Sequence, residues 1–186
     1  GLQYRDFVTV GILMRELSTP GGIIPDNWVY IQEPDITMGR LQIFNNWSEY
    51  MVAKPHETVW IGCEYFANEN DELYLKDDNA IIELAKSELT KMGMIDPQQY
   101  IDGVVFRLPK AYPAYFGTYN EFETIKSYCD TINNLFLVGR NGMHKYNNQD
   151  HSMLTAMTAV NLIKSGSTDK EDIWTVNTES EYHEAK

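Results

Sequence analysis

The sequence predicts an α+β fold, with a mostly antiparallel sheet flanked by helices. Two observations support this. In the first 66 residues, short apolar or alternating runs follow one another with loops but no helical pattern between them, which is typical of antiparallel strands. After residue 77, apolar residues recur at three- and four-residue steps, which is typical of helices that pack on such a sheet.

Four strands are expected in the first part of the chain. Residues 4–17 are β-branched and continuously apolar, so they predict a long central strand. A turn-rich loop follows at residues 19–27. Residues 28–32 and 41–45 alternate in the manner of strands, and residues 58–66 form the fourth candidate.

Helices dominate the second part. Asp77 or Asp78 is expected to cap a helix that Gly93 ends. The apolar face of this helix consists of Ile81, Leu84, Ala85, Leu89 and Met92. Residues 104–108 predict a further strand, residues 109–119 an extended segment, and residues 121–132 another helix.

The segment from residue 134 to residue 164 combines a strand pattern with a helical one. Residues 135–138 predict a short buried strand, and Gly139 and Gly142 a turn. A helix is expected from about Asp150 to Lys164, with Asp150 or Asn148 as its N-cap. Its apolar positions are Met153, Leu154, Met157, Val160 and Ile163. A glycine turn before a capped helix is able to bind a phosphate, but the same unit is also an ordinary packing unit, so the pattern alone leaves both interpretations open.

Composition excludes several classes of protein. A chain of 186 residues that is 43% hydrophobic can bury a core, whereas a net charge of −12 disfavours binding to nucleic acid or to an anionic membrane. Two cysteines and four histidines show no metal-ligand spacing, so no metal is expected. We find no apolar run of membrane-spanning length and expect a cytoplasmic protein.

The run LFLVGRNGMHKYNNQDHSMLTAM, residues 135–157, resembles the C-terminal flavin-binding signature of a superfamily. Its members are FAD-dependent amine oxidases, protoporphyrinogen oxidases and UDP-galactopyranose mutases. The resemblance covers nearly all of residues 2–164. It implies a substrate-domain sheet in residues 1–133 and a strand, loop and helix in residues 134–164 that return to the FAD-binding Rossmann domain. We call residues 134–164 the return segment. Residues 165–186 form a polar, acidic tail that is expected to fray.

No G-x-G-x-x-G spacing, the mark of a dinucleotide-binding unit, occurs in the sequence. The resemblance therefore implies a C-terminal fragment of an FAD-dependent oxidoreductase. Its partners would be an N-terminal FAD domain of the same protein and a small-molecule substrate, either a nucleotide sugar or an amine. FAD is the implied cofactor, and the fragment alone is expected to bind it weakly or not at all.

Individual roles follow from the resemblance. Gly139 and Arg140 match a Gly-Arg pair in which the arginine organises the flavin site, and Asp150 matches an aspartate near the ribityl chain. Tyr146 matches a tyrosine associated with the substrate diphosphate, and Lys145 the basic position beside it. The expected cofactor-binding residues are Gly139, Arg140, Asn141, Gly142, Asp150, His151 and Ser152. The expected substrate-binding residues are Asn46, Trp47, Lys145 and Tyr146. No catalytic residue is assigned.

Several alternatives stay open. One alternative is a mutase-like nucleotide-sugar isomerase. Two residues depart from the mutase pattern: His144 stands where the mutases have an aromatic hydroxyl, and Cys63 lies where they tend to place a basic residue. The other alternative belongs to another class of protein: a binding or interaction module that has kept this fold and binds no cofactor. Asn46 and Trp47 fit either a substrate pocket or a strand end with core aromatics.

Overall fold

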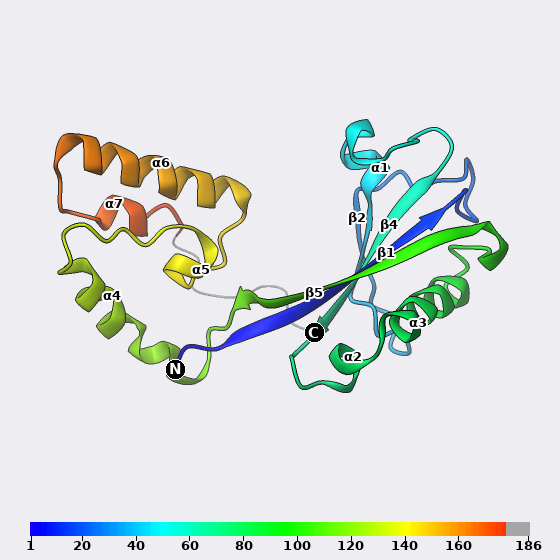
Figure 1. Ribbon diagram of the computed structural model, residues 1–186, viewed down its shortest axis with the longest axis horizontal. Helices are drawn as coiled ribbons and strands as arrows, with labels where there is room; N and C mark the ends of the chain where they lie inside the picture. Colours follow the sequence, from blue (N-terminus) through cyan, green and yellow to red (C-terminus); the bar gives the residue numbers. More distant parts are fainter. Residues whose placement is uncertain (178–186) are drawn as a thin grey trace. The chain divides into compact units, whose positions relative to one another are not determined.

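The computed structural model describes residues 1–177 (Figure 1). The chain forms two compact units, and each is described by itself. Unit 1 contains Gly1–Arg5 together with the chain from Lys110 onward, and unit 2 is Asp6–Pro109. The predicted α+β fold is confirmed: a five-stranded antiparallel sheet is flanked by helices in the part of the chain described.

The sheet has the strand order β2-β3-β4-β1-β5. Its strands are β1 (Tyr4–Met14), β2 (Trp28–Tyr30), β3 (Arg40–Ile43), β4 (Val59–Ala67) and β5 (Tyr100–Pro113). Strand β4 pairs antiparallel with both β1 and β3. The long β1 lies inside the sheet between β4 and β5, as its apolar sequence predicts. The fifth strand, Tyr100–Pro113, is longer than the predicted residues 104–108 and lies next to β1 at the edge of the sheet.

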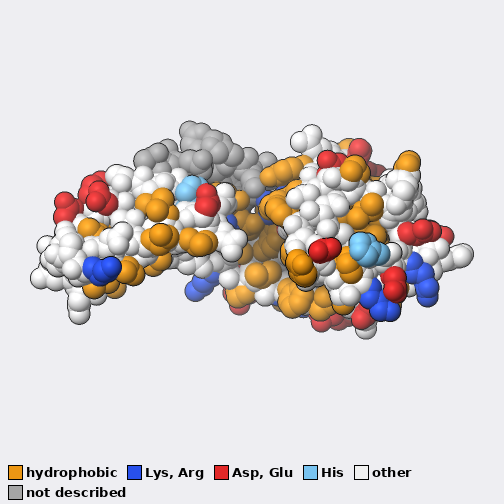
Figure 2. Space-filling view, turned by 90° about the horizontal axis from the view of Figure 1, so that it is seen from above, with side chains coloured by type: hydrophobic (Ala, Val, Ile, Leu, Met, Phe, Trp, Pro, Cys, Tyr) orange, Lys and Arg blue, Asp and Glu red, His pale blue; other side chains and the backbone are white. Residues whose placement is uncertain are grey.

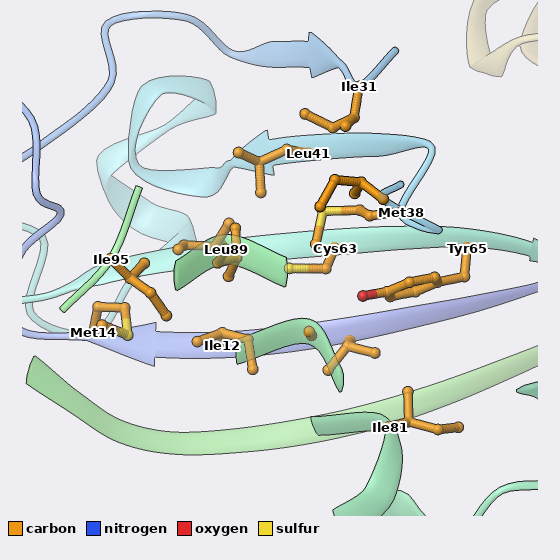
Figure 3. Packing of buried hydrophobic residues seen from close by; sticks show 14 of the residues in the cluster. Ile12, Met14, Ile31, Met38, Leu41, Cys63, Tyr65, Ile81, Leu89 and Ile95 are labelled. Carbon is orange, nitrogen blue, oxygen red and sulfur yellow. The ribbon is translucent and has the colours of Figure 1, made fainter. Parts of the chain in front are cut away.

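One face of the sheet carries the main core. Alternate residues of β1 point to this face, where Val8, Val10 and Ile12 are fully buried. Helix α3 (Asp78–Lys91) packs there through Ile81, Ala85 and Leu89, as its 3.6-residue periodicity predicts (Figure 3). Asp77 is the N-cap of α3 and accepts a hydrogen bond from the Ala80 N–H at 3.0 Å.

Short elements connect the strands of unit 2. They are α1 (Phe44–Trp47), α2 (Glu72–Leu75), and the 3-10 turns η1 (Glu49–Met51) and η2 (Pro97–Gln99). Residues 44 and 45, predicted to end a strand, instead begin α1. At Phe44 the chain leaves the sheet, and Asn45 bonds the backbone at residues 55, 58 and 60, which holds the turn of α1 against the following loop.

Unit 1 is built mainly from helices. They are η3 (Gly117–Glu121), α4 (Phe122–Asp130), α5 (Gly139–Met143), α6 (Gln149–Ser165) and α7 (Glu171–Trp174). A second hydrophobic cluster joins them and is centred on the buried residues Met143, Ala159, Ile173 and Trp174. The predicted helix at residues 121–132 is confirmed as α4.

Two local predictions in unit 1 are wrong, and a third, the fraying tail, is wrong for the described part of the tail. Residues 135–138 are not a strand: Val138 is extended, but the run packs against the helical cluster of unit 1 and has no strand partner among the described residues. The predicted turn at Gly139 and Gly142 is the five-residue helix α5. Fraying does not extend through the described tail, because α7 buries Ile173 and Trp174; residues 178–186 lie outside the described residues.

Candidate functional site

The start of α5 lies against the first turns of α6. The Gly139 N–H donates to Oγ1 of Thr155 at 3.1 Å, and a Cβ added at Gly139 would lie 3.7 Å from Oγ of Ser152. Gly139 has φ +73°, a conformation that favours glycine. These contacts bring the predicted cofactor-binding residues of the two helices into one small region of unit 1.

The guanidinium of Arg140 is held by backbone carbonyls and aromatic rings. Its Nε donates to the Asn147 carbonyl at 2.9 Å, and its Nη1 donates to the Ala111 carbonyl at 3.2 Å. The guanidinium carbon lies 4.8 Å from the ring centroids of both Tyr112 and Tyr146. Arg140 therefore ties the loop before α6 to the end of β5 through hydrogen bonds and cation–π contacts.

Lys145 is also engaged within unit 1. Its ammonium donates to the carbonyls of Trp174 and Asn177, the first at 3.1 Å. Burial lowers the pKa of Lys145 from its ordinary value. The adjacent Tyr146 donates its backbone N–H to the hydroxyl of Tyr115. Because its donors point to the end of α7, Lys145 fixes the loop between α5 and α6 rather than facing a ligand.

Helix α6 begins in an exposed, polar segment. Its N-cap is Asn148, which confirms one of the two predicted caps, and His151 Nδ1 accepts the Asn148 N–H at 3.2 Å in a capping box. Asp150 lies in the first turn with its side chain 79% exposed. Asn141 and Gly142 of α5 are exposed as well. The helix start thus presents backbone N–H groups, a carboxylate and small polar residues.

The side of α6 that faces away from the cluster is apolar. Thr155 and Ala159 are the buried residues of α6, and they lie on the side that faces the cluster. Five large apolar side chains on the helix are 49–61% exposed: Met153, Leu154, Met157, Val160 and Ile163. Hydrophobic side chains reach the surface over this part of the molecule in Figure 2. The predicted periodicity is therefore present, but it describes an outward-facing surface, which we call the α6 apolar face.

The other predicted substrate residues, Asn46 and Trp47, lie in α1 of unit 2. The side-chain amide of Asn46 donates to the carbonyls of Ile24 and Asp26, which anchors the preceding loop. Trp47 is 45% exposed and contacts the edge of Trp28. The structure thus shows an anchoring role for Asn46 and an exposed aromatic at Trp47.

A buried ion pair on the sheet face opposite α3 was not predicted. Arg40 Nε and Glu64 Oε2 are 2.6 Å apart, and both side chains are almost completely buried. The rings of Trp28 and Phe66 lie 4.8 and 5.0 Å from the Arg40 guanidinium carbon. Sequence alone gave no signal for this pair, because the two residues meet only through the β3–β4 register.

The sequence resemblance implies FAD as the cofactor, so we compare the polar groups of the return segment with the parts of that molecule. The cations Arg140 and Lys145 donate to backbone carbonyls, so a phosphate would be held mainly by N–H groups at the start of α6 and by the helix dipole. The exposed Asp150 carboxylate would repel a phosphate but can accept hydrogen bonds from the hydroxyls of a ribityl chain. The donor set is consistent with the polyol and phosphate parts of such a cofactor.

Other chemistry finds little support in the described part of the chain. No cluster of three or more potential metal ligands occurs there. Cys63 is buried in the core, and this burial raises the pKa of its thiol well above the usual range, which disfavours a role as a nucleophile. None of the helices in residues 1–177 has the length and apolar character needed to cross a membrane.

Comparison with known proteins shows similarity in fold. No protein-family model and no curated protein sequence matches the chain. Among solved structures, a reduced UDP-galactopyranose mutase matches 95% of this chain with a TM-score of 0.74 and 21% identity. A protein assigned as a protoporphyrinogen oxidase from Exiguobacterium sp. 255-15 matches 68% of this chain and 27% of its own, with a TM-score of 0.52 and 11% identity. The chain spans 37% of the mutase, so it has the fold of one part of that protein.

Proposed function

We propose that this chain is the substrate-domain sheet and return segment of an FAD-dependent oxidoreductase, and that it works together with an FAD-binding domain of the same protein. The observation that carries the proposal is the α6 apolar face. It lies on the helix that the flavin-binding signature predicts to return to the FAD-binding domain. The fold match to just over a third of the mutase supports the same assignment.

The α6 apolar face needs a covering partner on energetic grounds. Five adjacent large apolar side chains, each about half exposed, form a contiguous apolar stripe on one helix. Fully burying a side chain of this kind stabilises by about 1.5–3 kcal/mol, and roughly half of that is still available at each position. An FAD-binding domain that docks here would bring its cofactor to the start of α6.

The residues divide into two roles in this proposal. Gly139, Asn141 and Gly142 would allow the cofactor to approach the backbone, and the start of α6 with Asp150, His151 and Ser152 would hold its polar chain. Arg140, Lys145 and Tyr146 would position this loop. The flavin, when bound, supplies the redox chemistry, while the protein orients it and shapes the substrate cavity. Asn46 and Trp47 are proposed as substrate-binding residues of unit 2.

A mutase-like nucleotide-sugar isomerase is the second candidate, supported by the higher TM-score of the mutase. Such an enzyme must hold a diphosphate. On the described sheet face, Arg40 is already paired with Glu64, and in unit 1 Lys145 and Arg140 donate to carbonyls. These contacts favour the oxidoreductase over the isomerase.

The docking role is tested with Met157→Glu in the protein that carries the FAD-binding domain. A charge placed on the α6 apolar face should lower flavin retention by about tenfold or more, because a buried unpaired carboxylate costs several kcal/mol. Leu75→Glu is the matched control, since Leu75 is 69% exposed on a helix of unit 2. Flavin content is measured by visible absorption after gel filtration. Equal retention in both variants would remove α6 as the docking helix.

A further inference from the structure

Strands β1 and β4 contain a pair of facing glycines. Gly11 lies directly opposite Gly62 in the antiparallel register, so both open on the same face of the sheet, the one away from α3. Glycine weakens a strand and often marks a place where another group approaches the backbone closely. Two glycines at one cross-strand position therefore mark a place where the sheet is bare of side chains.

Aromatic rings lie low over this bare patch. A Cβ added at Gly62 would be 2.9 Å from the ring of Phe44, and one added at Gly11 would be 3.2 Å from the ring of Trp60. Any side chain at either position would push these rings away from the sheet. The glycines thus allow two aromatic walls to form directly on the sheet surface.

These walls enclose an apolar pocket of about 320 Å³. Val104 and Phe106 of β5 and Met51 of η1 also line the pocket. Val104, Phe106 and Met51 are 37%, 57% and 53% exposed, so the pocket opens to solvent. The volume lies in the range of ligand sites, roughly 300–1,000 Å³.

The two charged groups next to the pocket have opposite signs and are paired with each other. Thr9, which lines the pocket, lies opposite Glu64 in the β1–β4 register, and Glu64 is paired with Arg40 on β3. Gln42 donates its side-chain amide to the same carboxylate. The pocket wall therefore contains one hydroxyl and no net charge, which suits neither a phosphate nor an ammonium group.

We propose that this pocket, which we call the glycine-floored pocket, binds the uncharged, apolar ring portion of a small-molecule substrate. The inference deepens the proposed function by naming the substrate class, and it rests on that proposal in assigning the ligand as substrate. Aromatic walls can contact a flat ring over a large area. Because the pocket wall has no net charge, an uncharged ligand leaves no charged side chain buried and unpaired. Thr9 is the one side chain of the pocket with a hydroxyl that can bond a polar substituent of the ring.

The test uses two dyes that differ by one charged group. N-phenyl-1-naphthylamine is uncharged, and 8-anilino-1-naphthalenesulfonate carries the same rings with a sulfonate. Each is titrated into the purified chain of residues 1–186 and followed by fluorescence. We expect saturable binding of the uncharged dye and binding of the sulfonate that is about tenfold weaker or more, because the pocket has no cation to pair with it.

Variants locate the site. Phe106→Ala removes an exposed wall, and Gly11→Leu fills the pocket; each should weaken the uncharged dye by about tenfold or more. Ile101→Ala, at another exposed apolar position of β5, should leave the dye affinity unchanged. Far-UV circular dichroism shows whether each variant is folded. If Gly11→Leu does not fold, the dye affinity of Phe106→Ala alone decides whether the pocket is the binding site.

Three results would overturn the proposal: equal affinity for both dyes, unchanged affinity in Phe106→Ala, or competitive displacement of the uncharged dye by uridine diphosphate. The last would assign the pocket to a nucleotide instead. These outcomes are independent of the proposed function, because flavin retention in Met157→Glu is measured without any ligand in the glycine-floored pocket.

Discussion

At the scale of single residues, Arg140 and Lys145 stabilise the loop between α5 and α6. Arg140 has two carbonyl acceptors and two tyrosine rings, and Lys145 has two carbonyl acceptors at the end of α7. We propose that a side chain with these contacts would affect a bound cofactor through the shape of the loop.

Arg140 is therefore predicted to act as a positioning residue. In the protein that carries the FAD-binding domain, Arg140→Met should lower flavin affinity by about tenfold or more and also reduce the melting temperature, because hydrogen bonds from a charged group are lost. Arg140→Lys should give a smaller change of the same sign, and Lys164→Met, at an exposed cation of α6, should give none. Flavin retention, midpoint potential and thermal melting are measured. Unchanged affinity and potential in both Arg140 variants would remove Arg140 from the site.

His144 is predicted to make the stability of unit 1 depend on pH. The ring is 2% exposed among Tyr4, Tyr119 and Phe122, its Nε2 bonds the Ala114 carbonyl, and its Nδ1 has no partner among the described residues. Burial lowers the pKa of His144 below 6.5, and the bond to Ala114 opposes this only in part. The unfolded chain then takes up a proton at a higher pH than the folded chain does.

The expected result is a free energy of unfolding that is constant above pH 6.5 as far as His144 is concerned and falls as the pH drops from 6.5 through the lower folded pKa. Urea unfolding at a series of pH values measures this slope. His144→Asn should flatten it, since Asn tolerates the φ of +48° found here, while His56→Asn at an exposed site should not. A slope that is equal in all three proteins would show that His144 does not cause it.

At the scale of elements, helix α6 has one polar start and two different long sides. Asn148 and His151 cap it, Thr155 and Ala159 face the cluster of unit 1, and the α6 apolar face points outward. The cap fixes where the helix begins, and with it the direction of the first N–H groups. A change at the cap should therefore affect both stability and flavin binding.

Asn148→Ala is predicted to lower the free energy of unfolding by about 0.5–2 kcal/mol, the usual cost of losing an N-cap. Asp150→Ala should cost less, about 0.3–1 kcal/mol, because an exposed first-turn carboxylate contributes mainly through the helix dipole. Urea unfolding followed by circular dichroism compares the two. The opposite order would make Asp150 the effective cap and would contradict the geometry of α6.

Elements were predictable wherever a periodic pattern coincided with burial against the same unit. The long β1 and the apolar face of α3 are of this kind, whereas the cap of α6 was predicted from its residue type. The structure of residues 135–138 was not predictable, because an apolar run indicates burial without specifying whether the neighbouring element is a strand or a helix. The Arg40–Glu64 pair and the Gly11–Gly62 pair depend on strand register, which a single sequence does not determine.

At the scale of the whole molecule, the chain has two units with separate clusters, and each unit presents apolar surface to solvent. The α6 apolar face in unit 1 and the glycine-floored pocket in unit 2 are assigned to a protein domain and to a small molecule respectively. Both assignments are proposals that require a dinucleotide-binding domain. The chain spans 37% of the mutase that it matches in fold.

The most direct test of this account is a titration of residues 1–186 with FAD, followed by flavin fluorescence. The return segment supplies only the start of α6 and a few polar groups to a cofactor, while the adenine and most of the pyrophosphate contacts would come from the FAD-binding domain. We therefore predict that the chain purifies colourless and binds FAD weakly or not at all. Tight binding at a ratio of one FAD per chain would contradict the account.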